Sequence, residues 1–298
     1  MKPILHHYPL SPFAEKIRRM LAYCEQPYQS VETSPMLPRR DLDQLTGGYR
    51  RIPVMQWGAD IYCDTRVISE RIAGDCGRPE LAPSKQTEEQ TAFIEKVDGE
   101  LFFAIVGVAF AGKLEDKARK EFGILGLLRF AWDRMKLMKG AKSQPPKGAE
   151  ARAMVQTHLS DLEARLQNSS YLWGETPTLA DFSAYHSAWF LFVAGEHPGL
   201  EAYPELQAWM QRMATLGGED IVTISAADSL SQAYAAQPDL GVNVGGEQTT
   251  VIPDDYGLLP VQGRLVATEA DEYVLERDSQ KAGCIHVHFP RKGFVCRS

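Results

Sequence analysis

Ser11 stands where an apolar, strand-like run ends and an amphipathic helix begins. The run PILHHY covers residues 3–8, and Pro12 occupies the first helical position after the serine. Serine is a common N-cap, and a helix N-terminus offers free N–H groups and a partial positive charge that attract anions. A hydroxyl has one donor and two acceptor sites, so Ser11 can cap the helix and still donate a hydrogen bond to a ligand. The sequence therefore predicts an anion site at this helix end.

The elements that position Ser11 alternate between strand and helix over the first 75 residues. The patterns predict strands at 3–8, 27–33, 52–57 and 60–63, and helices at 12–23, 40–45 and 65–73. Gly74 is expected to end the last of these helices. A right-handed crossover makes the first two strands parallel, and Gly58-Ala59 closes a hairpin between the last two. The order predicts a small mixed sheet with flanking helices.

The rest of the chain divides into three stretches that differ in composition and hydrophobic pattern. Residues 77–86 are rich in turn-forming residues and are expected to be a linker. From 87 to 237 every segment has a helical period, and the helix that begins after Thr178 carries a capping box with Asp181. Residues 238–298 alternate apolar and polar side chains between turns, which predicts a small β-rich extension of four or five strands.

Composition excludes several classes of protein. The chain carries 32 Lys and Arg against 39 Asp and Glu, and its net charge of −7 argues against nucleic acid as a partner. The sequence has no apolar run of membrane-span length and no recognisable signal peptide. Its five cysteines form no CxxC pair, and His286 and His288 lack a third metal ligand at useful spacing. We expect a cytoplasmic protein with reduced thiols, no metal and no membrane partner.

Three stretches together resemble the soluble glutathione transferases. They are SPFAEKIR, RRIPVMQWGADIYCDTRVISERI and TLADFSAY, and the Ser-Pro-Phe form is similar to the tau class and neighbouring bacterial groups. The resemblance covers about residues 1–235. It implies an α/β thioredoxin-like N-terminal domain over 1–76 and an all-α transferase-type C-terminal domain over 87–237. The β-rich extension over 238–298 is unusual for that family.

The resemblance implies glutathione as the co-substrate and gives Ser11 a catalytic role. A free alkyl thiol has a pKa of about 8.5, so little thiolate exists at neutral pH. A hydroxyl that donates to sulfur at a helix N-terminus favours the thiolate. Tyr8 is the alternative catalytic residue, because some classes of the family use a tyrosine at the end of the first strand. Phe13 belongs to the same motif and is expected to contact glutathione.

Five further residues match the family's glutathione-binding positions. Arg51 stands where the family often has a lysine two residues before the proline. Ile52 and Pro53 match the backbone clamp for the cysteinyl unit, although the pattern alone does not decide whether their peptide bond is cis. Asp64 and Thr65 match by type the Glu-Ser pair that holds the γ-glutamyl end.

The implied reaction is attack by the glutathione thiolate on a small apolar electrophile. We expect the electrophile between the sheet domain and the first long helix, predicted at 87–112, with Phe102, Phe103 and Ile105 as walls of its pocket. Such an enzyme would serve detoxification and form a homodimer. Two alternatives stay open: a non-catalytic glutathione-fold binding or interaction protein that uses 238–298 as its surface, and glutathione-dependent isomerase or lyase chemistry.

Overall fold

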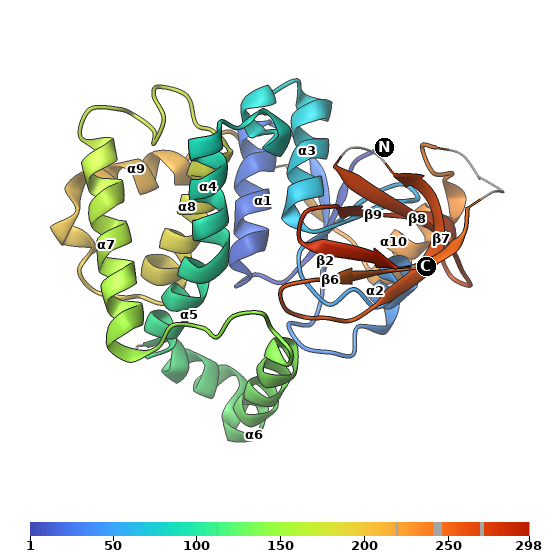
Figure 1. The fold of residues 1–298 in the computed structure, drawn as a ribbon, viewed down its shortest axis with the longest axis horizontal. Coiled ribbons are helices and arrows are strands. Elements are labelled where there is room, and N and C mark those ends of the chain that lie inside the picture. Colours follow the sequence, from blue (N-terminus) through green and yellow to red (C-terminus); the bar gives the residue numbers. More distant parts are fainter. Residues whose placement is uncertain (112, 219, 241–245, 269–270, 298) are drawn as a thin grey trace.

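In the computed structural model the strands of the described residues form one mixed sheet, which lies on one side of the molecule (Figure 1). The structure describes residues 1–298 except 112, 219, 241–245, 269–270 and 298. The strands are β1 (Ile4–His7), β2 (Tyr28–Glu32), β3 (Val54–Trp57), β4 (Asp60–Cys63), β5 (Ile221–Thr223), β6 (Gln248–Pro253), β7 (Val261–Thr268), β8 (Glu272–Ser279), β9 (Gly283–Pro290) and β10 (Phe294–Arg297). Their order across the sheet is β10-β6-β7-β8-β9-β4-β3-β1-β2-β5.

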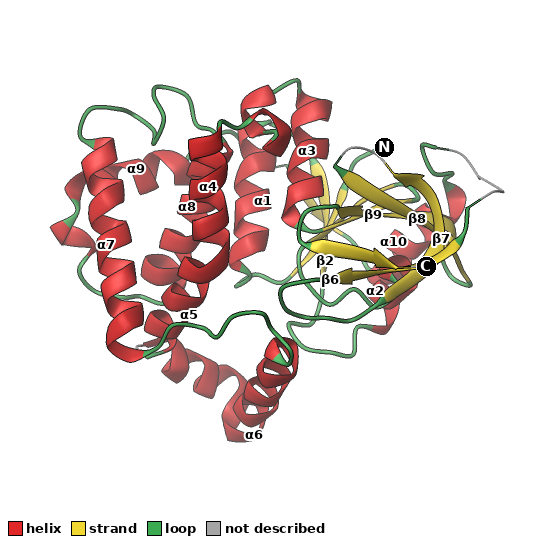
Figure 2. Ribbon diagram, viewed as in Figure 1, coloured by secondary structure: helices red, strands yellow, loops and turns green. Residues whose placement is uncertain are grey.

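Most helices gather on the side of the molecule opposite to the sheet, as the colours of Figure 2 show. The helices are α1 (Pro12–Tyr23), α2 (Arg40–Thr46), α3 (Thr65–Cys76), α4 (Glu88–Lys96), α5 (Phe102–Phe110), α6 (Lys113–Met138), α7 (Gly148–Leu166), α8 (Leu179–Trp189), α9 (Pro204–Ala214) and α10 (Ala226–Ala235). Helices α2 and α10 lie beside the sheet (Figure 1). Among the described residues, no helix combines the length and apolar character that a membrane crossing needs.

Helix α1 forms where the sequence predicts it. Ser11 is its N-cap, and the Ser11 hydroxyl oxygen accepts a hydrogen bond from the backbone N–H of Ala14 at 3.3 Å. Ile17, Met20 and Leu21 are fully buried, which gives the helix the apolar stripe expected from their spacing. Strand β1 pairs in parallel with β2 and antiparallel with β3. The predicted parallel pairing of the first two strands is therefore confirmed, and the N-terminus of α1 follows directly on the end of β1.

The two faces of the sheet pack against different helices. Met55 on β3 belongs to the core cluster that includes side chains of α1, α3 and the helical domain. Its neighbour Val54 points to the other face, in a second cluster with α2, α10 and the strands of the extension. This alternation follows from the two-residue period of a strand. The N-terminal sheet is thus buried on both sides.

The C-terminal extension continues the N-terminal sheet. Strand β9 pairs in parallel with β4, with Ile61 opposite Val287 and Tyr62 opposite His288. The rings of Tyr62 and His288 stack with their centroids 4.3 Å apart. Within its described residues the extension therefore forms the strands β6–β10, which confirms the predicted β-rich region, and they share one sheet with β1–β4.

Two boundaries differ from the sequence prediction. Helix α3 does not end at Gly74 but runs to Cys76, and Gly77 ends it with a left-handed φ of 64°. A glycine inside a helix costs only about 1 kcal/mol, which the packing of α3 can offset. Residues 221–223, expected among helices, form β5 beside β2. This strand is too short and too exposed to show an alternating pattern.

The first long helix, predicted over 87–112, is interrupted in the structure. Helix α4 ends at Lys96, and α5 begins at Phe102 after a π-helical turn. Gly99 in that turn has the non-helical angles φ −101° and ψ −112°. Residue 112, at the predicted helix end, lies outside the described residues. The interruption bends the chain beside the cavity described below.

The contact between β4 and β9 gives a pH-dependent prediction. His288 lies 2.9 Å from Asp60 and 3.4 Å from Glu272. Burial lowers the pKa of His288, but the hydrogen bonds to both carboxylates raise it more, so the net pKa lies above 6.5. Protonated His288 therefore stabilises the fold below about pH 6.5, and this contribution is lost as pH rises through the folded-state pKa. We expect His288→Gln to lower the free energy of unfolding more at about pH 6 than at about pH 9, measured by urea denaturation.

His286, two residues away on β9, provides the control. Burial lowers its pKa below 6.5, so the folded state resists protonation of this side chain. Wild-type His286 therefore contributes less to the free energy of unfolding as pH falls. The loss of stability caused by His286→Gln should shrink toward about pH 5. The same pH trend in both variants would contradict the assignment of a charged His288.

Candidate functional site

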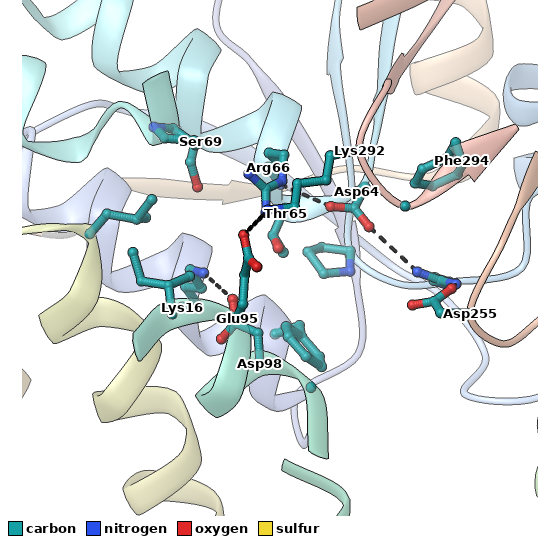
Figure 3. A pocket seen from close by; sticks show the side chains of 18 of the residues that line it. Lys16, Asp64, Thr65, Arg66, Ser69, Glu95, Asp98, Asp255, Lys292 and Phe294 are labelled. Carbon is teal, nitrogen blue, oxygen red and sulfur yellow. Dashed lines mark hydrogen bonds and ion pairs between the residues drawn. The ribbon is translucent and has the colours of Figure 1, made fainter. Parts of the chain in front are cut away.

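A cavity of about 270 Å³ lies where the N-terminal domain, the helical domain and the extension meet (Figure 3). Residues from all three parts line it. From the N-terminal domain these include Phe13, Lys16, Tyr49, Arg51, Ile52, Pro53, Asp64, Thr65, Arg66 and Ser69; from the helical domain Ile94, Glu95, Asp98 and Gly99; and from the extension Asp255, Tyr256, Lys292, Gly293 and Phe294.

The cavity brings together all six residues that the sequence analysis proposed for glutathione binding, which are Phe13, Arg51, Ile52, Pro53, Asp64 and Thr65. The Ile52–Pro53 peptide bond is cis. Asp64 is the N-cap of α3, and its carboxylate accepts a hydrogen bond from the backbone N–H of Arg66 at 3.0 Å. The cavity therefore faces the first turn of α3, where partial positive charge favours an anionic ligand.

Asp64 combines a special backbone conformation with a partly buried carboxyl group. Its φ of 95° is rare for a residue with a side chain and costs on the order of 1–3 kcal/mol. Burial raises the pKa of Asp64, and the guanidinium of Arg51 and the N–H of Arg66 lower it in part, leaving it above its ordinary value. The neighbouring structure thus holds this carboxyl group at the cavity wall despite the strained backbone and the loss of solvation.

Ser11 and Tyr8 are not among the residues that line the cavity. Ser11 is only 2% exposed, and its backbone N–H donates to the carbonyl of Tyr8 at 3.0 Å. Within the described structure the Ser11 hydroxyl accepts one hydrogen bond, from Ala14, and donates none. Its proton is therefore available to an acceptor, and the catalytic roles assigned to Ser11 and Tyr8 stay predictions.

The three residues predicted to wall the electrophile pocket do not line this cavity, but Phe102 and Phe103 contact residues that do. The ring of Phe102 lies 4.7 Å from the ring of Phe13, and the ring of Phe103 lies 5.3 Å from that of Tyr256. Ile105 is 1% exposed and belongs to the main core cluster. The role of these three residues stays a prediction.

Arg51 is held mainly by the extension. Its guanidinium donates to the carboxylate of Asp255 and to the carbonyl of Tyr256, and it lies 4.0 Å from the centre of the Tyr256 ring. It also lies 3.6 Å from the Asp64 carboxylate. Burial lowers the pKa of Arg51, but the tyrosine and carboxyl groups around it raise it more, so the net pKa is raised. The sequence does not predict Asp255 and Tyr256 as site residues, because nothing local in it marks a contact over 204 residues.

A second buried charged group lies on the opposite wall. The ammonium of Lys16 donates to one carboxylate oxygen of Asp98 at 2.7 Å, and the other oxygen is 2.9 Å from Nε2 of His186. Lys16 is 2% exposed and His186 is fully buried. Burial raises the pKa of Asp98, but Lys16 and His186 lower it more, so the net pKa lies well below its ordinary value. Asp98 is therefore an ionised carboxylate at the cavity wall.

The fold and the cavity define the class of this protein. Residues 5–79 match the glutathione S-transferase N-terminal domain, and residues 129–216 match the glutathione S-transferase C-terminal domain. The crystal structure of a GST-like protein from Pseudomonas syringae matches this chain with a TM-score of 0.76, and the two sequences are 30% identical. The match covers 100% of this chain, extension included, and 99% of that one. The chain belongs to the glutathione S-transferase family.

A more distant structure matches a smaller share of this chain. The glutathione S-transferase from Sinorhizobium meliloti 1021 is 20% identical, with a TM-score of 0.50 over 72% of this chain and 89% of that one. This likeness supports the fold. A comparison with curated proteins found no match.

The Lys16–Asp98 pair yields a stability prediction. Asp98→Asn leaves the Lys16 ammonium buried beside a neutral amide, and losing one partner of a buried pair costs about 3 kcal/mol. We expect that loss in the free energy of unfolding, measured by urea denaturation at neutral pH. Glu89→Gln is the matched control, because Glu89 pairs with Arg165 at an exposed site and should change stability by less than about 0.5 kcal/mol. Equal losses in the two variants would contradict the role given to this pair.

Proposed function

We propose that the protein binds glutathione and activates its thiol for transfer to a small apolar electrophile. One observation carries the proposal: Ile52, Pro53, Asp64 and Thr65 line a single cavity in a chain of this family. In the proposed complex the cysteinyl backbone lies against Ile52 and Pro53. The γ-glutamyl end reaches the N-terminus of α3, where Thr65 offers a hydroxyl and the helix offers partial positive charge.

The proposed chemistry is stabilisation of the thiolate. The Ser11 hydroxyl donates to sulfur while it accepts from Ala14, and the N-terminus of α1 adds its partial positive charge. Each unit by which the thiol pKa falls corresponds to about 1.4 kcal/mol of preferential binding of the anion. Because Phe13 lines the cavity and follows Ser11 by two residues, the proposal places the sulfur beyond the Phe13 ring, toward Ser11.

The electrophile would bind where the aromatic groups of three segments meet. Phe13, Phe102 and Phe103 form a connected row of rings that ends at Tyr256 of the extension. Such a surface favours apolar substrates through burial and ring contacts. The proposed role is detoxification of small electrophiles. The homodimer and the cytoplasmic location expected from the sequence stay predictions.

Glutathione binding is the first test of this proposal. Millimolar glutathione should raise the melting temperature, and calorimetric titration should show one site per chain. Thr65→Val should weaken binding about five- to tenfold, because it removes one hydrogen bond to a charged group. Thr223→Val, on the exposed strand β5, should leave the affinity unchanged. A protein indifferent to millimolar glutathione would overturn the proposal.

Thiolate activation is tested by an ultraviolet titration of bound glutathione. Ser11→Ala should raise the apparent pKa of the bound thiol by about one unit, and Ser11→Thr should retain the wild-type titration. Since Ser11→Ala also removes a helix cap, its stability should fall by about 1 kcal/mol, so titrations are made well below the melting temperature. If only Tyr8→Phe shifts the titration, Tyr8 is the activating residue. If the wild-type thiol titrates as in solution, the protein is a non-catalytic binder.

A further inference from the structure

The C-terminal extension contributes a charged side chain to the candidate glutathione site. We propose that Lys292, in the turn between β9 and β10, binds the α-carboxylate of the γ-glutamyl group. The extension would then complete the binding site. This inference rests on the proposed function, since it assigns one subsite of the same ligand.

The position of Lys292 supports this role. It lines the same cavity as Thr65 and Arg66, which begin α3 (Figure 3). Its ammonium donates to the carboxylate of Glu95 at the end of α4. The guanidinium of Arg66 lies 3.6 Å from the same oxygen of Glu95. Two cations from different parts of the chain therefore share one carboxylate at the cavity mouth.

The charged side chains that line the cavity balance, with four cations against the carboxylates of Asp64, Glu95, Asp98 and Asp255. Asp64 pairs with Arg51, which Asp255 also holds. Asp98, on the opposite wall, pairs with Lys16. Arg66 and Lys292 both contact the carboxylate of Glu95. A ligand carboxylate would give Arg66 and Lys292 a second acceptor through charge-assisted hydrogen bonds.

The positions of Lys292 and Arg66 favour the γ-glutamyl carboxylate over the glycyl carboxylate as the ligand group that they bind. Arg66 lies in the first turn of α3, beside the Asp64-Thr65 pair proposed for the γ-glutamyl end, and Lys292 contacts the same Glu95 oxygen as Arg66. The helix end adds its own attraction for an anion at this place. Arg51 is occupied by Asp255 and Tyr256 of the extension.

A matched pair of lysine variants tests the role of Lys292. Lys281 belongs to the same extension, pairs with Asp41 and is 60% exposed in its side chain, against 59% for Lys292. Lys292→Met should weaken glutathione binding about five- to tenfold in calorimetric titrations at moderate salt. Lys281→Met should stay within about twofold of wild type. Melting curves establish that both variants are folded.

A ligand that lacks one carboxylate locates the contact. 4-Aminobutyryl-Cys-Gly is glutathione without the α-carboxylate of the γ-glutamyl group. Wild type and Lys292→Met should bind it equally. γ-Glutamylcysteine, which lacks the glycyl unit, should keep the full difference between the two proteins. This pattern would assign Lys292 to the α-carboxylate.

The possible failures are distinguishable. If wild type binds glutathione and Lys292→Met binds it equally well, the inference is wrong and the proposed function stands. A difference that persists with 4-aminobutyryl-Cys-Gly also overturns the inference, because Lys292 then acts on another part of the ligand. If wild type does not bind glutathione at all, both the proposed function and the inference fall.

Discussion

The parallel pairing of β4 with β9 is the interaction on which the rest of this structure depends. Without it β4 would be the edge of the N-terminal sheet, with one row of backbone groups unpaired. The pairing covers that edge, and Ile61 and Val287 bury their side chains in the same core cluster. His288 and Asp60 join the two strands through a buried hydrogen bond. The N-terminal domain and the extension therefore act as one sheet.

The third wall of the cavity is a consequence of this shared sheet. Once β9 is fixed, the turn that follows it carries Lys292 to the mouth, and the loop after β6 carries Asp255 and Tyr256 to Arg51. The same loop meets the helical domain, where the N–H of Gly257 donates to the carbonyl of Leu137 at 2.9 Å. A cleft between two domains thus gains a third wall. In our account this wall takes part in recognising the ligand.

The sequence predicts the parts of this site that depend on neighbouring residues. Ser11 caps α1, and the strands and helices of the first domain have clear periods, so the places of Pro53 and Asp64 follow from local signals. The partners of Arg51 do not follow, because a strand pattern shows that residues 238–298 form strands but not which strand they join. Asp98 and His186 were missed for the same reason, since 88 residues separate them. Strand β5 is not predictable from the sequence, because its three exposed residues show no alternating pattern.

A crystal structure of the protein with glutathione tests the central claim most directly, because it measures where the thiol lies relative to all three walls. Our account predicts the cysteinyl backbone against Ile52 and Pro53, with sulfur within hydrogen-bond distance of the Ser11 hydroxyl. It also predicts contacts between the ligand and the extension. A thiol directed at Tyr8 and away from Ser11, or a ligand that touches no residue of the extension, would contradict it.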